Sequence, residues 1–123
     1  MVLLRKSNPQ SHNLKTTVVH GVMLEKYMNI PPSEIDGARV LEWAWSGNKP
    51  FGVIPCGATE PPIEIFGLAI CQYPASEKVY RFSCNSSWEV EQDSDYESSI
   101  EAKANLPQQY QEVKAVWESY KAN

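Results

Sequence analysis

Apolar and polar residues alternate most clearly between positions 79 and 90, which predicts an antiparallel hairpin. Residues two apart point to the same face of a strand. The small polar residues at 85–87 supply the reversal between the two strands. One face would be apolar and the other mainly polar and solvated. The apolar face would carry Tyr80, Phe82, Cys84, Trp88 and Val90.

A short helix is predicted directly after this hairpin. Ser98 and Glu101 match a capping box, in which each side chain accepts a hydrogen bond from the other residue's amide. Ile100 and Ala104 then share a helical face, and Pro107 stops the helix. A helix of about two turns is unstable alone, so it must pack on the sheet.

The segment 108–120 fits both the period of a strand and that of a helix. Its Val, Trp and Tyr content favours a final strand, with a closing helix as the alternative.

The first half of the chain is less regular. Residues 16–24 are rich in β-branched side chains and predict a strand, and residues 25–29 predict a helical turn. A further strand is predicted at 38–45, where Leu41, Trp43 and Trp45 alternate with other residues. A helix that starts at Ser33 is the alternative there.

Proline and glycine dominate residues 47–62, which predicts an irregular loop with a short strand at 51–54. The stretch 63–73 is the most apolar of the chain, and it predicts one long central strand with a bulge at Gly67. These elements predict an α+β fold class. We expect an antiparallel sheet of about five strands in a meander, with one or two short helices packed on one face. Residues 1–13 would be a mobile N-terminal tail and residues 14–123 a single domain.

Composition and charge exclude several classes of partner. The 15 acidic and 11 basic side chains give a net charge of −4, and the basic residues form no stripe. We therefore expect no nucleic-acid binding and no membrane binding. The chain start has only a short apolar run, which does not resemble a secretory signal. Three widely spaced cysteines favour a reduced, cytoplasmic protein.

The sequence contains little that resembles catalytic machinery. His12 lies in the predicted tail, and His20 lies in an apolar stretch where a packed role is expected. The cysteines show no paired metal-ligand spacing, and no phosphate-binding loop or nucleophile motif occurs. We therefore expect no catalytic residues, no metal site and no cofactor.

The candidate partner-binding residues lie in two places. A run of alternating carboxylates would line the solvated face of the hairpin, and the proline-rich loop would carry Phe51 and Cys56. Such a run is also typical of a charged strand edge that prevents sheet-to-sheet association. The carboxylates of this run are Glu89, Glu91, Asp93 and Asp95.

These features predict a small acidic protein-interaction or inhibitory module that binds a basic protein partner. In size and charge the chain is similar to bacterial inhibitor and toxin-immunity proteins. Two alternatives stay open: a small-ligand pocket lined by aromatic residues, and a non-catalytic homodimeric subunit. The pocket candidates are Trp43, Trp45, Phe66 and Tyr80.

Overall fold

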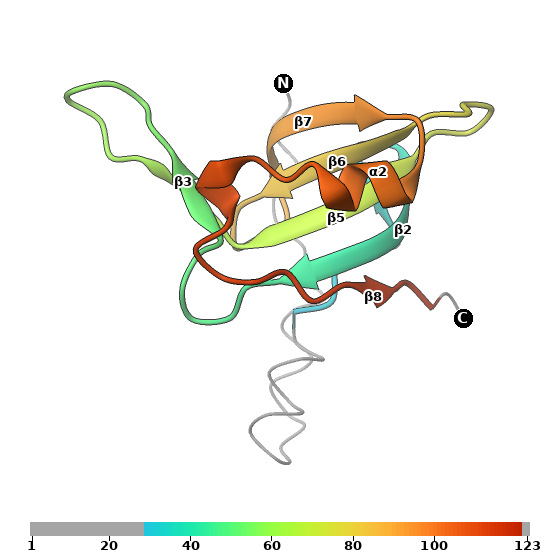
Figure 1. Ribbon diagram of the computed structural model, residues 1–123, viewed down its shortest axis with the longest axis horizontal. Coiled ribbons are helices and arrows are strands. Elements are labelled where there is room, and N and C mark those ends of the chain that lie inside the picture. The colour runs from blue at the N-terminus through green and yellow to red at the C-terminus, as the bar shows by residue number, and fades with distance from the viewer. Residues whose placement is uncertain (1–28, 122–123) are drawn as a thin grey trace, which may run out of the picture.

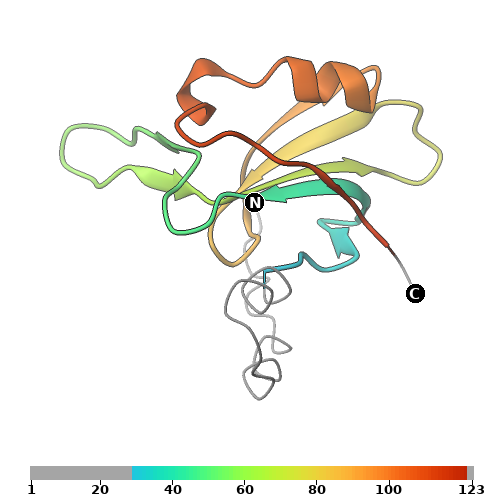
Figure 2. The same ribbon diagram turned by 60° about the horizontal axis from the view of Figure 1, so that its bottom comes forward.

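An antiparallel sheet that curls into a half-barrel forms the body of the protein (Figures 1 and 2). The computed structural model describes residues 29–121. Every strand pairing in the described residues is antiparallel. The order of the main sheet is β1 (Glu34–Ile35), β2 (Ala38–Trp45), β5 (Gly67–Gln72), β6 (Val79–Cys84) and β7 (Val90–Tyr96), and β8 (Glu118–Ser119) also pairs with β2.

The α+β prediction is wrong, because the described residues form mostly antiparallel sheet. They contain a single α-helix, α2 (Ser99–Ala104), and one 3₁₀ turn, η2 (Gln108–Tyr110). The predicted cap is confirmed, since the Ser98 hydroxyl accepts from the amide of Glu101 at 3.1 Å. The Glu101 carboxylate accepts from the amide of Glu97 at 2.7 Å, not from that of Ser98 as predicted. Six residues cannot form a second layer, so the fold is a sheet with a small cover.

The predicted long strand at 63–73 is divided between two sheets. Its first part is β4 (Ile63–Ile65), which pairs with β3 (Gly52–Ile54) in a separate two-stranded ribbon. Its second part is β5, in the centre of the main sheet. Phe66 separates the two parts, and its amide donates to the carbonyl of Cys84 at 2.9 Å. The ribbon projects from the half-barrel as an arm, defined here as residues 52–65 (Figure 1).

One face of the main sheet, the aromatic face, carries the apolar side of the predicted hairpin. Phe82, Cys84 and Trp88 are buried there together with Trp43 from β2. A β-bulge between Val40 and Glu42 changes the register of β2. Leu41 consequently packs on the opposite face, away from Trp43, although the alternation predicted that the two share one face.

The opposite face, the helix face, is covered by α2 and the C-terminal segment (Figures 1 and 2). Ala102 of α2 packs against Ile70 and Val79. Arg81 and Ser83 lie on this face and are 1 % and 0 % exposed. The prediction that the polar side of the hairpin is solvated is therefore wrong for β6. For β6 the alternation predicted correctly which residues share a face, but it did not indicate that a later segment folds back over the polar face.

The C-terminal segment is neither the long strand favoured from its composition nor the alternative helix. After η2 it runs without regular structure until β8, which has only two residues. Tyr110 of η2 is fully buried against Phe51 and Ile65, so side-chain burial holds this segment in place. The amide of Glu112 also donates to the carbonyl of Phe51 at 3.1 Å.

The predicted tail at 1–13, the strand at 16–24 and most of the helical turn at 25–29 lie outside the described residues, as do His12 and His20. The proposed division into a tail and a domain stays a prediction. Between residues 29 and 121, no helix is long and apolar enough to span a bilayer.

Candidate interaction surface

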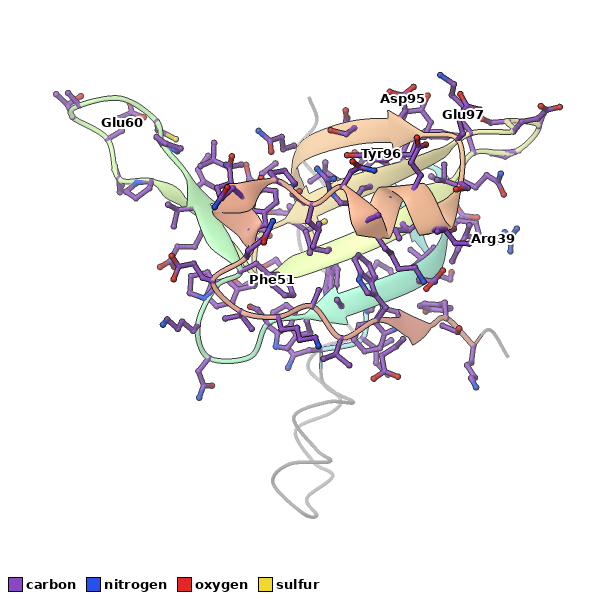
Figure 3. All side chains as sticks on the ribbon, viewed as in Figure 1. Arg39, Phe51, Glu60, Asp95, Tyr96 and Glu97 are labelled. Atoms are coloured by element: carbon purple, nitrogen blue, oxygen red, sulfur yellow. The ribbon has the colours of Figure 1, made fainter. Side chains whose placement is uncertain are left out.

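Strand β7 forms one edge of the main sheet as far as the described residues show. Its inner side pairs with β6 from Val79↔Tyr96 to Ser83↔Gln92, and an irregularity precedes the pair Cys84↔Val90. Glu91, Asp93 and Asp95 are exposed along this strand. Figure 3 shows Asp95 and Glu97 on the outer rim of the sheet. The structure thus brings three of the four predicted carboxylates to one free edge.

One cation lies within this group of carboxylates. Lys78 donates to Asp95 Oδ2 at 2.9 Å and lies 3.8 Å from Glu97 Oε2. The hydrogen bond and charge of Lys78 lower the pKa of Asp95, and the hydrogen bond to Asp95 is the main cause of a raised Lys78 pKa. Asp93 forms no ion pair within residues 29–121. Negative charge therefore exceeds positive charge along the outer side of β7.

The fourth carboxylate, Glu89, belongs to the turn and is partly buried. Asn85 organises this turn: its side-chain carbonyl accepts from the amides of Ser87 and Glu89, at 2.9 and 3.0 Å. Its Nδ2 donates to Glu89 and Glu91, at 2.8 and 3.0 Å. Trp88 takes a left-handed φ of 61°, which directs its ring into the aromatic face. Glu89 thus acts within the turn, while Glu91 lies at the end of the acidic edge.

Phe51 and Cys56 do not join the acidic edge. Phe51 is 0 % exposed at the base of the arm, where it packs with Ile65 and Tyr110, and so it cannot present its ring to a partner. Cys56 is partly exposed in the arm, and its thiol donates to the carbonyl of Ile54 at 3.7 Å. In Figure 3, Glu60 marks the far end of the arm, away from β7.

The pocket candidates belong to two rows of aromatic rings. Trp45 stacks on Phe66 with 5.8 Å between ring centroids, and its ring lies 5.7 Å from that of Trp88. Trp43 packs edge-on against Trp88 at 6.3 Å. Tyr80 lies in a second row of rings with Tyr73 and Phe82, at 5.3 and 6.4 Å. Trp43, Trp45 and Phe66 thus lie in a row with Trp88, and Tyr80 lies in the other row.

A buried cation is the feature that sequence reasoning missed. The Arg81 guanidinium lies 5.5 Å from the Tyr96 ring and 6.0 Å from the Tyr110 ring, and Nη1 donates to the Tyr96 hydroxyl at 2.7 Å. No carboxylate between residues 29 and 121 forms an ion pair with it. Cation–π contact with two rings compensates part of the desolvation cost. Tyrosines on segments distant from Arg81 in sequence offer no local signal of this arrangement.

The two cysteines inside the sheet are also buried. Burial raises the pKa of the Cys71 thiol from 9.0 to about 12, and the charge of Asp36 contributes to this increase. Cys71 is therefore a protonated, apolar core residue rather than a nucleophile. In the part of the chain that the structure describes, no three His, Cys, Asp or Glu side chains cluster to hold a metal ion.

A comparison with protein-family models finds no match for this chain, and comparisons with curated proteins and with solved structures find none either. The functional argument therefore depends on the surface itself.

Proposed function

We propose that this protein is a protein-interaction module that binds a basic protein partner through the outer side of β7. The observation that carries the proposal is a set of four exposed carboxylates: Glu91, Asp93, Asp95 and Glu97. Among the described ion pairs, Lys78 is the only cation that contacts this set, and it contacts Asp95 and Glu97. An excess of one charge on a sheet edge steers a partner of opposite charge and raises its association rate. Cys56 and Cys71 are present as thiols rather than disulfides, which supports a reducing, cytoplasmic location as part of this proposal.

The proposal is tested by charge reversal with a matched control. Glu91→Lys with Asp93→Lys reverses two charges on β7. Glu60→Lys with Glu64→Lys reverses two exposed charges on the arm and changes the net charge of the chain equally. Tagged wild-type protein and both variants are used to capture partners from the native host at low salt.

The expected result is a basic protein captured by the wild type and the arm variant and lost with the β7 variant. Near-ultraviolet circular dichroism confirms that the variants keep their tertiary packing. If the β7 variant captures the same proteins as the wild type, the acidic edge is not the binding surface and the proposal fails.

A further inference from the structure

Two residues of β7 direct their main-chain N–H and C=O groups away from β6, toward the open edge of the sheet. Along a strand of an antiparallel sheet, successive residues point their N–H and C=O groups alternately toward the strand on one side and toward the strand on the other side. The amide of Asn85 donates to the carbonyl of Glu89 at 3.0 Å, so the Asn85 N–H points toward the β7 side of the hairpin. One residue earlier, the carbonyl of Cys84 accepts from the amide of Phe66 and so points toward β5. Ser83 and Arg81 of β6 lie two and four residues before Asn85. Their main-chain N–H and C=O groups therefore also point toward β7.

The register transfers this alternation to β7. Ser83 is opposite Gln92 and Arg81 is opposite Ser94, so Gln92 and Ser94 direct their main-chain groups toward β6. Asp93 and Asp95 alternate with them and direct their N–H and C=O groups away from β6.

The same two residues place their carboxylates on one face of the sheet. Asp93 is opposite Phe82 and Asp95 is opposite Tyr80, and both partners belong to the aromatic face. The outer edge therefore combines, at alternate positions, a main-chain donor and acceptor with a negative side chain. The β-bulge next to Glu91 ends this regular stretch, which limits the edge to a short segment.

On the basis of the proposed function, we propose that the partner contributes a short extended segment that adds to β7 as an antiparallel strand. The segment carries Lys or Arg at two positions, i and i+2. These residues lie opposite Asp93 and Asp95, where directly opposed side chains are about 5 Å apart and opposite charges attract. Strand addition provides affinity through main-chain hydrogen bonds, and the alternate charges provide specificity. The proposed antiparallel direction matches the main sheet, in which every described pairing is antiparallel.

The probe is a synthetic peptide of alternating Lys and Thr, compared with a peptide of the same composition in which the Lys residues are adjacent. Two further peptides carry N-methyl groups, one on the Lys amides and one on the Thr amides. In the proposed pairing the Lys amides face β7 and the Thr amides face solvent, so the two methylated peptides form a matched pair. Binding is measured by fluorescence anisotropy at low salt, and amide exchange in the protein is measured by NMR.

The expected result is that methylation of Lys amides weakens binding by about tenfold or more, while methylation of Thr amides changes it by less than about threefold. Peptide binding should slow amide exchange at Asp93 and Asp95.

If both methylated peptides bind like the unmodified one, strand addition is overturned. In that case the variant Asp93→Lys tests the proposed function. If Asp93→Lys abolishes peptide binding, the proposed function stands without strand addition; if Asp93→Lys has no effect, the proposed function fails as well. An alternating peptide that does not bind measurably also overturns strand addition, because the charged edge then serves only to prevent association.

Discussion

Replacement of Gly52 by Ala tests how closely the arm and the C-terminal segment approach each other. A β-carbon at position 52 would lie 1.5 Å from the carbonyl oxygen of Gln109 and 3.2 Å from the Cα of Tyr110. The first distance is that of a covalent bond, and the obstructing atom belongs to the main chain, which cannot rotate away. The Gly52→Ala variant must therefore separate β3 from η2.

The size of the loss follows from what this separation exposes. Tyr110 is 0 % exposed, and a buried tyrosine removes about 150–250 Å² from water. At about 25 cal/mol per Å², full release of this side chain would cost about 4–6 kcal/mol. A backbone shift that keeps Tyr110 inside would still cost about 1–3 kcal/mol through overpacking. We expect Gly52→Ala to lower the free energy of unfolding by about 3 kcal/mol at least, the upper end of the overpacking cost, and by about 6 kcal/mol at most, the cost of full release.

The assay is equilibrium urea unfolding, with Gly47→Ala as the matched control. Gly47 has a φ of +92°, and a β-carbon added there would meet no atom within 4 Å, so its replacement adds only backbone strain of about 1–2 kcal/mol. A double-mutant cycle adds Tyr110→Ala to Gly52→Ala. If the two substitutions act on the same contact, the second costs much less in the presence of the first. The reasoning is refuted if Gly52→Ala costs no more than Gly47→Ala, or if the two effects in the cycle add.

Three other predictions concern packing, pH and capping. Gly67→Ala places a β-carbon 2.5 Å from the ring of Trp88, which must move; the expected loss is about 1–3 kcal/mol with a red shift of tryptophan fluorescence, and unchanged emission would contradict it. Burial raises the pKa of Tyr110, so below about pH 10 this hydroxyl is protonated in both the folded and the unfolded state, and as the pH rises further the unfolded state loses its proton first. The free energy of unfolding should fall above that pH, and urea titrations should show a smaller fall for Tyr110→Phe; an equal fall would refute this role. Ser98→Ala removes the helix cap and should lower the urea midpoint by the equivalent of about 1 kcal/mol without changing the slope, whereas an unchanged midpoint would show that the cap contributes nothing.

Local patterns in the sequence determined the elements whose residues interact with near neighbours. The strand at Ala38–Trp45, the hairpin of β6 and β7 and the cap at Ser98 could all be predicted, because alternation and capping depend on residues a few positions apart. The acidic character of β7 was visible for the same reason. The prediction that its carboxylates line the polar face of the hairpin was wrong for Asp93 and Asp95, because the bulge next to Glu91 puts them opposite Phe82 and Tyr80 on the aromatic face. The predicted single strand at 63–73 was wrong, because an apolar run does not show where a chain passes from one sheet to another.

Contacts between distant segments were decided only by the tertiary structure. The chain around Tyr110 folds back over β6, which buries Arg81 and turns a face that looks solvated in the sequence into an interior. The same folding leaves the outer side of β7 as an edge among the described strands, and the register of the turn at Asn85 directs the main chain of Asp93 and Asp95 outward. Hydrophobic burial is not directional, so the sequence indicates which residues tend to be buried but not which segment covers them.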